Sequence, residues 1–423
     1  MGGGTITGCV NSGSVKRSTA GNAYVGGIIG YENIALTISN CSNSGTIGQS
    51  NNAGVGGIIG YDSSTVTMSD CSNSGTIYGV GDIRGTGGII GDMTAGTVTD
   101  CTNTGRVAGY TQHAGGIIGI LYGGSMSGCI NNGGYVTCTG TRCGGVGGSL
   151  YGSGTVSNCS SSGAVSSKGW CGGFVGGTTG VGRVIIENCY ATGNVTMATS
   201  STVDYAGGFA GCVYNGKTIR KCYSTGNVTG IALRKCNGGF VGYNYGTIDN
   251  CYATGNIAGS GSQYYACFVG DNRGTIRRCY ATGNMTSTVP NRCAGFVGLN
   301  CYNTHKIYNC FCTGTVASNT YNGMFCSTYT SGISNCGCRD HATIRDIGSP
   351  VGDVTYAKAD PTEWYDKTEN VYDTGTYTWD FATPVWWEYN NDYPKFIEDP
   401  TLATTSNATF FGCNFIILNN LDI

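Results

Sequence analysis

The chain has 423 residues, of which 75 are Gly and 24 are Cys, and only 11% are charged, with 22 basic against 24 acidic side chains. This balance excludes a basic surface for nucleic acid or anionic lipid, and no apolar run reaches the roughly 20 residues of a membrane helix. The lack of a G-x-y period excludes collagen, and a hydrophobic share of 40% excludes general disorder.

A repeat of about thirty residues begins at the amino end and continues to about residue 338. Each repeat contains one Cys in similar surroundings, as in TITGCVNSGSV, TISNCSNSGTI and IIENCYATGNV. A second motif lies between these marker cysteines, for example GGIIGY at 26–31 and GGFVGY at 238–243. The twelve markers are Cys9, Cys41, Cys71, Cys101, Cys129, Cys159, Cys189, Cys222, Cys251, Cys279, Cys310 and Cys336.

Each repeat is typical of extended chain, because Val, Ile, Thr and Tyr are broken by Gly, Asn and Asp without a helical stripe. An apolar residue lies three positions before each marker, and another follows about six positions after it, as Ile38 and Ile47 do around Cys41. On a flat strand an offset of three would place Ile38 and Cys41 on opposite faces. We therefore expect a corner before the marker, where ten of the twelve repeats have Gly, Asn or Asp.

These strands predict an all-β fold. One strand before the corner, one after it and one at the GG motif would form a three-sided coil, and stacked coils form a parallel β-solenoid. Twelve coils at about 4.8 Å each would make a rod of about 55–60 Å. A β-propeller is the rival fold, but thirty residues are too few for a four-stranded blade. We predict a parallel β-helix of about 12 coils over residues 1–338.

Stacking would place the marker cysteines in one inward column. We interpret this column as a structural core ladder of small buried side chains, since parallel side chains fit disulfide geometry poorly. No C-x-x-C and no H-E-x-x-H occurs, so we predict neither a metal site nor a cofactor. Two positions after the marker, the first five repeats have Asn, which predicts a ladder of hydrogen-bonded amides.

The later repeats have an aromatic residue directly after the marker, at a position expected to point outward. This column, the predicted tyrosine strip, consists of Tyr190, Tyr223, Tyr252, Tyr280 and Phe311. One interpretation is a self-stabilising aromatic stack; the other is a binding strip for sugar rings or for apolar residues of a partner. Acidic residues are scattered singly, without the clustered carboxylates of a glycosidase, so we predict that the protein is not an enzyme.

The ends differ from the repeats. Residues 339–398 contain Trp364, Trp379, Trp386 and Trp387, and we expect them to fold back as an aromatic cap over the last coil. Residues 399–423 are expected to add a strand or an assembly contact. At the amino end, Met1 is followed at once by repeat sequence without a signal peptide. This predicts either a fragment of a longer exported chain or an uncovered edge that assembles end to end.

Residues 238–259, GGFVGYNYGTIDNCYATGNIAG, resemble the GLUG motif, a repeat of bacterial surface proteins, of adhesins and of the non-catalytic region of some IgA-cleaving metallopeptidases. Residues 379–396, WDFATPVWWEYNNDYPKF, are similar to the segment that often closes such arrays. The resemblance implies a right-handed β-helix displayed outside a cell. It carries over no protease activity, because the metallopeptidase residues have no counterpart here.

The expected function is a non-enzymatic extracellular or cell-surface solenoid that acts as an adhesin, a stalk or a display scaffold. Its expected partners are host or cell-surface glycans or proteins. A protomer of a self-assembling extracellular filament is the alternative, and a carbohydrate-active β-helix enzyme is the second alternative.

Overall fold

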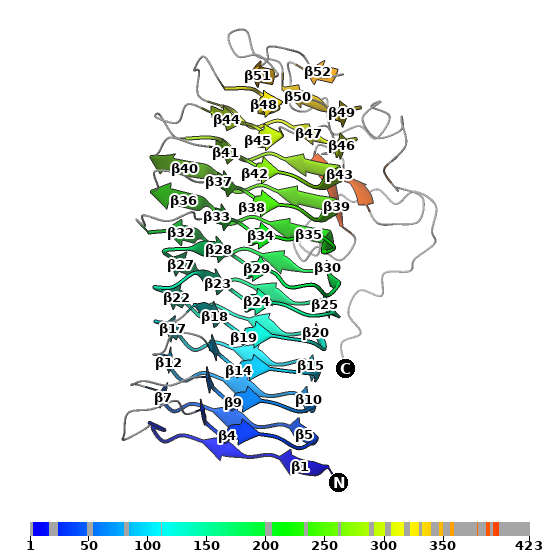
Figure 1. Cartoon of the computed structure of the whole chain (residues 1–423). Helices are drawn as coiled ribbons and strands as arrows, with labels where there is room; N and C mark the ends of the chain where they lie inside the picture. Colours follow the sequence, from blue (N-terminus) through cyan, green and yellow to red (C-terminus); the bar gives the residue numbers. More distant parts are fainter. Residues whose placement is uncertain are drawn as a thin grey trace, which may run out of the picture.

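The computed structural model describes residues 3–16, 24–48, 54–79, 84–110, 112–198, 205–231, 236–260, 264–286, 292–300, 306–316, 322–329, 332–339, 347–349, 356–358, 379, 386–389 and 392–396. All regular elements among these residues are β-strands, and all of them except a hairpin near the carboxyl end stack into one rod (Figure 1). Coils are numbered here by their marker cysteines, so that coil 1 carries Cys9 and coil 12 carries Cys336. The predicted all-β parallel solenoid is confirmed.

Coil 3 shows how one repeat folds. Its strands are β8 (Val55–Gly56), β9 (Ile59–Asp62), β10 (Val66–Ser69), β11 (Ser72–Asn73) and β12 (Ile77–Gly79). Each strand pairs in parallel with the equivalent strands of the coils below and above. Coil 3 therefore has five short strands instead of the three that the sequence predicts, because the GG motif is a bend between two strands and the chain after the corner also forms two strands.

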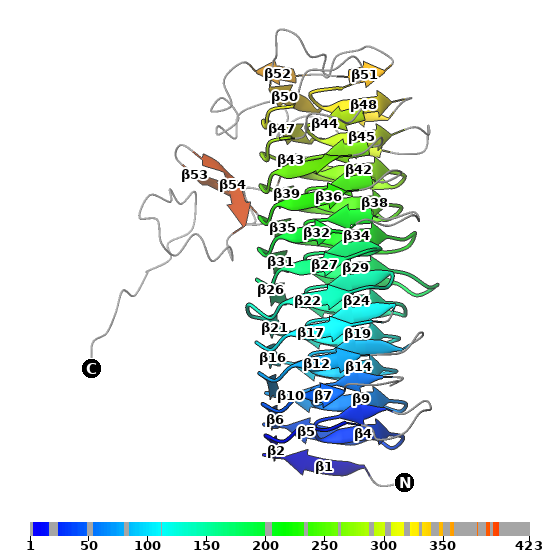
Figure 2. The same cartoon turned by 90° about the vertical axis from the view of Figure 1, so that its left-hand side faces the viewer.

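The strands form four long sheets, which run side by side along the rod (Figure 2). Sheet A holds the strands on both sides of the corner: β1 (Gly4–Thr7), β2 (Val10–Asn11), β5 (Leu36–Ser39), β6 (Ser42–Asn43), β10, β11, β15 (Gly96–Thr99), β16 (Thr102–Asn103), β20 (Ser125–Ser127), β21 (Ile130–Asn131), β25 (Gly154–Ser157), β26 (Ser160–Ser161), β30 (Val184–Glu187), β31 (Tyr190–Ala191), β35 (Thr218–Ser224), β39 (Thr247–Ala253), β43 (Thr275–Ala281), β46 (Lys306–Tyr308), β47 (Phe311–Cys312), β49 (Ile333–Ser334), β50 (Gly337–Arg339) and β52 (Tyr356–Lys358).

Sheet B holds the strands that follow sheet A in each coil: β7 (Ile47–Gly48), β12, β17 (Val107–Gly109), β22 (Val136–Cys138), β27 (Val165–Ser167), β32 (Val195–Met197), β36 (Val228–Ile231) and β40 (Ile257–Ser260). Sheet C holds the strands that enter the GG bend: β3 (Val25–Gly26), β8, β13 (Gly85–Gly87), β18 (His113–Gly115), β23 (Arg142–Gly144), β28 (Trp170–Gly172), β33 (Tyr205–Gly207), β37 (Cys236–Gly238), β41 (Tyr264–Ala266) and β44 (Arg292–Ala294).

Sheet D holds the strands that leave the bend: β4 (Ile29–Glu32), β9, β14 (Ile90–Met93), β19 (Ile118–Leu121), β24 (Gly147–Leu150), β29 (Val175–Thr178), β34 (Ala210–Val213), β38 (Val241–Asn244), β42 (Val269–Asn272), β45 (Val297–Asn300), β48 (Cys326–Tyr329) and β51 (Ile347–Ser349). The bend between sheets C and D needs glycine. A Cβ on Gly88 would lie 2.0 Å from the carbonyl oxygen of Gly116, and one on Gly87 would lie 1.8 Å from that of Ile90. Close approach of the backbones thus explains the GG pair.

A left-handed residue makes the corner of every coil. The residue before each marker has a positive φ, from Asn40 (53°) in coil 2 to Asn335 (49°) in coil 12, and Gly8 and Gly128 occupy the same place in coils 1 and 5. The apolar residue before the corner and the marker Cys after it therefore both face the core, as Ile38 and Cys41 do. The predicted corner is present.

Side chains at equivalent positions pack in register along the core. Cys222, Cys251 and Cys279 lie opposite one another on neighbouring strands. A second core column is aromatic: the rings of Phe174, Phe209, Phe240, Phe268, Phe296 and Phe325 stack at centroid distances of 4.7 to 5.1 Å. The buried rings follow the repeat from coil 7 to coil 12, so one continuous core runs through the rod.

Part of the expected cap lies against the side of the rod. Trp379 is buried, its ring stacks on Tyr280 and contacts Phe311, and its indole nitrogen donates to the carbonyl oxygen of Asn309 at 2.9 Å. The strands β53 (Trp386–Tyr389) and β54 (Asp392–Phe396) form an antiparallel hairpin beside sheet A (Figures 1 and 2). Trp364, the remaining residues of the 339–398 segment apart from 339, 347–349 and 356–358, and all of 399–423 lie outside the described residues.

Candidate binding surface

The surroundings of the marker cysteines indicate a structural role. Every cysteine that the structure describes is a free thiol, and all of these except Cys9 are buried. The thiols of Cys71, Cys101 and Cys222 donate to the carbonyl oxygen two residues earlier at 3.2, 3.2 and 3.1 Å, across the left-handed corner. Burial raises the pKa of the Cys189 and Cys251 thiols, which keeps them protonated as donors. Within the described ranges, no group of three His, Cys, Asp or Glu side chains is arranged to hold a metal ion.

The asparagine column forms the expected ladder. The amide of Asn43 donates to the Oδ1 of Asn73 at 2.6 Å, and the amide of Asn73 donates to that of Asn103 at 2.7 Å. Each amide also donates to the carbonyl of the glycine two residues on and accepts that glycine's N–H, at 3.0 and 3.2 Å for Gly75. These buried amides are therefore satisfied within the rod and point to no ligand.

A second asparagine ladder was not predicted. Asn244, Asn272 and Asn300 stack at the ends of sheet D strands, with amide-to-amide hydrogen bonds of 2.8 Å in both steps. The sequence signal is an Asn with Gly two residues later, as in NYG and NRG, which is the same spacing as in the first ladder.

The predicted tyrosine strip is a closed stack. Its rings lie nearly parallel, with centroids 5.0, 4.8, 5.0 and 5.1 Å apart from Tyr190 to Phe311. All of its members except Tyr190 are buried, and Trp379 covers the upper end. The column therefore does not offer the open face that a binding strip needs, and Trp379 covers Tyr280 and Phe311 at its upper end.

A different row of rings and guanidinium groups lies on the outside of the GG bend. We call it the aromatic–arginine strip; its members are Tyr24, Tyr31, Tyr61, Arg84, Tyr122, Arg142, Tyr151, Trp170, Tyr205, Tyr214, Tyr243, Tyr245 and Arg273. Each lies at or next to the start of a sheet C strand or the end of a sheet D strand. The bend brings these two ends together, as the 2.6 Å hydrogen bond from Arg142 to the Tyr151 hydroxyl shows across nine residues.

The lower part of the strip is built on three tyrosines. The ring of Tyr24 lies 5.4 Å from Tyr31 and 4.7 Å from Tyr61, and Arg84 lies over Tyr61 at 4.7 Å. Below Arg84 is Asp92, which is fully buried and lies 3.5 Å from the guanidinium. Burial raises the pKa of Asp92 to about 7, although Arg84 and the N–H of Gly85 oppose this shift.

The middle of the strip centres on Arg142. This guanidinium lies over the rings of Tyr151 and Trp170 at 5.6 and 4.7 Å, and Tyr151 stacks on Tyr122 at 5.6 Å. His113 is buried beside it, with Nδ1 2.7 Å from the Ser149 hydroxyl. Burial and the charge of Arg142 lower the pKa of His113 to about 3, so this imidazole is neutral. His305 and His341 lie outside the described residues.

The upper part continues without a break. Trp170 contacts Tyr205 and Tyr214 at 5.8 and 5.9 Å, and Tyr205 stacks on Tyr243 at 4.5 Å. Tyr243 packs on Tyr245 at 4.8 Å, and Arg273 covers both at 5.2 and 5.7 Å. The linked contacts thus run from Tyr122 in coil 5 to Arg273 in coil 10, and the Tyr24–Arg84 group of coils 2 to 4 forms a separate cluster below them.

Several rings of the strip face solvent. Tyr31 is 50% exposed, Tyr122 is 38% exposed and Tyr214 is 39% exposed. A tyrosine ring offers an apolar face and a polar edge, and a guanidinium offers up to five donors. The strip therefore has the chemistry to hold a ligand that has both flat apolar faces and hydrogen-bonding groups.

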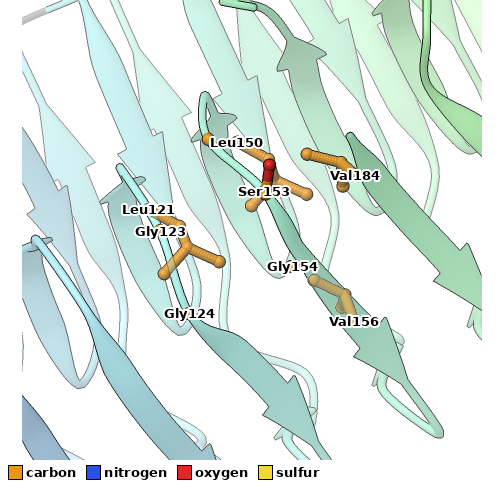
Figure 3. A pocket seen from close by; sticks show the side chains of 9 residues that line it. Leu121, Gly123, Gly124, Leu150, Ser153, Gly154, Val156 and Val184 are labelled. Atoms are coloured by element: carbon orange, nitrogen blue, oxygen red, sulfur yellow. The ribbon is translucent and has the colours of Figure 1, made fainter. Parts of the chain in front are cut away.

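The pocket in Figure 3 is small and mostly apolar, unlike the aromatic–arginine strip. It is lined by Leu121, Leu150, Val156 and Val184 together with glycine turns, and Ser153 is its only side-chain hydroxyl. Its volume of about 10 Å³ admits no more than about one water molecule. It is a packing gap between successive coils and has no room for a ligand.

Comparison with a solved structure gives one distant likeness. That structure is described as a "putative immunoglobulin A1 protease" from Bacteroides ovatus, with 22% identity, a TM-score of 0.40, and coverage of 54% of this chain and 70% of the other. At this TM-score the likeness bears on neither fold nor activity. No curated protein matches the chain. The part of the chain that the structure describes contains no helix with the length and apolar character to span a membrane.

Two segments match the family model described as the GLUG motif, residues 204–229 and 236–258. They correspond to coils 8 and 9, including the GG bend, the left-handed corner and the marker Cys of each. Among the described residues, coils 2 to 7, 10 and 11 show a bend between sheets C and D, a left-handed corner and a marker Cys in the same order. The chain therefore contains GLUG-motif repeats.

Proposed function

We propose that this protein is a non-enzymatic extracellular or cell-surface solenoid that binds glycan chains along its aromatic–arginine strip. The observation that carries the proposal is the row of ring and guanidinium contacts that joins Tyr122 to Arg273, with the Tyr24–Arg84 group below it on the same side of the bend. The rod would present this row as an adhesin or display scaffold does. The extracellular location is supported by the GLUG repeats, which resemble those of bacterial surface proteins.

The shape of the strip favours a glycan over a protein partner. A stable protein interface buries about 800 Å² on each side, as a compact patch with an apolar centre. The strip is instead narrow, and it follows the rod across successive coils. A linear polysaccharide has this shape, its sugar rings offer flat apolar faces for tyrosine, and its hydroxyls accept hydrogen bonds from arginine.

The test is a glycan array probed with the full chain and with single variants. Tyr122→Ala and Tyr214→Ala should each weaken binding about tenfold, the equivalent of about 1.4 kcal/mol for one lost ring contact. Tyr135→Ala is the matched control, because Tyr135 is 41% exposed and lies outside the strip. Analysis of the bound glycans by mass spectrometry should show them uncleaved.

Three results would overturn the proposal. The first is a lack of binding to any glycan, and the second is an equal loss in Tyr135→Ala. The third is cleavage of a bound glycan, which would support the carbohydrate-active alternative. Electron microscopy of the same preparation addresses the filament alternative, which predicts long fibres instead of single rods.

A further inference from the structure

An open pocket of about 490 Å³ lies at the upper end of the aromatic–arginine strip, where sheet D strands turn into sheet A. Three cationic residues line it, Arg183, Lys217 and Arg273, and no carboxylate does. The turns come from successive coils, because Ile185 pairs with Thr218, Thr218 with Thr247, and Thr247 with Thr275. The pocket therefore spans coils 7 to 10 and carries a concentrated positive charge.

Lys217 is built into the wall of the pocket. Only 1% of this residue is exposed, and its ammonium donates to the carbonyl oxygens of Gly180, at 3.0 Å, and Gly182. Burial lowers the pKa of Lys217, and the two carbonyls hold its ammonium in place. These two hydrogen bonds to backbone carbonyls fix the position of the Lys217 ammonium in the wall of the pocket.

Arg273 and Tyr245 connect the pocket to the strip. The Arg273 guanidinium lies 3.3 Å from a carboxylate oxygen of Asp271, which does not line the pocket, and over the ring of Tyr245 at 5.7 Å. Thr218, Thr247 and Thr275 add one hydroxyl from each of three coils. Arg183 is exposed and has no ion pair among the described residues. It is the cation that is free to meet a ligand.

We infer that this pocket binds the carboxylate of an acidic sugar residue whose ring packs on Tyr245. The inference rests on the proposed glycan binding and specifies its chemistry as a uronic acid type of glycan. Arginine pairs with carboxylates through two parallel hydrogen bonds, which is the recognition that Arg183 can supply. The pocket is also within the range of about 300–1,000 Å³ that small-ligand sites occupy, enough for one sugar residue.

The test compares two probes that share one sugar backbone, the negatively charged oligogalacturonate and its uncharged methyl ester. The full chain should bind the acid more tightly than the ester, and the difference should shrink as salt is added. Arg183→Gln should weaken binding of the acid about tenfold and leave binding of the ester unchanged. Tyr245→Leu should weaken both probes. Arg220→Gln is the matched control, because Arg220 pairs with Glu187 and does not line the pocket.

The outcomes separate this inference from the proposed function. Equal binding of acid and ester, or a wild-type affinity of Arg183→Gln for the acid, overturns the acidic subsite while strip binding can still be measured on neutral glycans. Preference for a sulfated neutral oligosaccharide over the uronate overturns the carboxylate assignment. Loss of acid binding in Arg183→Gln, with no loss in Tyr122→Ala, supports the pocket and contradicts the strip.

Discussion

A single residue with a left-handed backbone conformation turns every coil. The type of this residue predicts the turn in most coils but not in all of them. Gly, Asn and Asp tolerate a positive φ, and their presence before ten markers predicts the corner correctly. Lys221 and Arg278 occupy the same place with φ of 52°. Their residue types favour no such conformation. The coils stacked above and below impose this positive φ. Contacts between coils therefore determine the backbone conformation where the residue type alone would not favour it.

The buried carboxyl of Asp92 predicts a specific dependence of stability on pH. Its pKa is raised to about 7 in the folded protein, against about 4 in an unfolded chain. Between these values the folded state keeps a proton that the unfolded state releases. The free energy of unfolding therefore falls as pH rises, by about 1.4 kcal/mol per pH unit from this group. The contribution is fully present below pH 4 and is lost above pH 7.

Asp92→Asn should remove this part of the slope, measured as the urea midpoint from pH 4 to pH 7. Asp70→Asn is the control, because Asp70 is an exposed corner residue for which Asn is equally suited to a positive φ. An unchanged slope in Asp92→Asn would show that the carboxyl is ionised in the fold.

At the scale of elements, the asparagine ladder joins neighbouring coils. Asn73 donates to Asn103 and to Gly75, and it accepts from Asn43 and from Gly75. Asn73→Ala would leave buried partners unsatisfied on both adjacent coils, at a cost of about 2–4 kcal/mol in the free energy of unfolding. Urea denaturation measures this loss. Ser74→Ala, one residue away and exposed, should stay within about 0.5 kcal/mol. Equal midpoints for both variants would mean that the ladder adds no stability.

The ladders and the strip differ in how well sequence predicts them. A ladder repeats one residue type at one position, so Cys101 or Asn103 is visible in the repeat itself. The strip combines positions on both sides of the GG bend, seven to nine residues apart, such as Tyr24 with Tyr31 and Arg142 with Tyr151. It varies between Tyr, Trp and Arg, and nothing in one repeat marks it. Only the folded bend shows that these positions meet.

The burial of an outward-pointing ring also cannot be predicted from a single repeat. Sequence places Tyr280 and Phe311 on the outside of sheet A, and the structure agrees that they stack there. Their cover comes from Trp379, which bonds to Asn309 across seventy positions. Contacts of such separation leave no trace in a thirty-residue period, so the sequence could not decide between a self-stabilising stack and an open binding strip.

At the scale of the whole rod, two kinds of coil share one shape. Coils 2 to 5 combine Asn after the marker with Ile in the GG motif, as Asn73 and Ile58 do in coil 3. Coils 7 to 12 combine Ala, Ser or Cys with Phe, as Ala253 and Phe240 do in coil 9. A larger core residue thus accompanies a smaller neighbour in the same coil. This exchange keeps the volume of the core nearly constant, as close packing requires, and lets the outer strip continue in one line.

That continuous line predicts how affinity depends on the length of the ligand. From coil 5 to coil 10 the linked part of the strip spans about 24 Å at about 4.8 Å per coil. Each added sugar residue meets further rings at high effective concentration, so affinity should rise with oligomer length until the chain matches the strip, and then level off. Trp170→Ala removes the ring that joins the middle to the upper part, so it should flatten this rise while the shortest oligomers bind as before. Isothermal titration with a series of purified oligomers measures the dependence, and Tyr135→Ala should follow the wild-type curve. An affinity that is the same for the shortest oligomer and the polymer would confine binding to a single pocket and contradict a binding surface that extends along the rod.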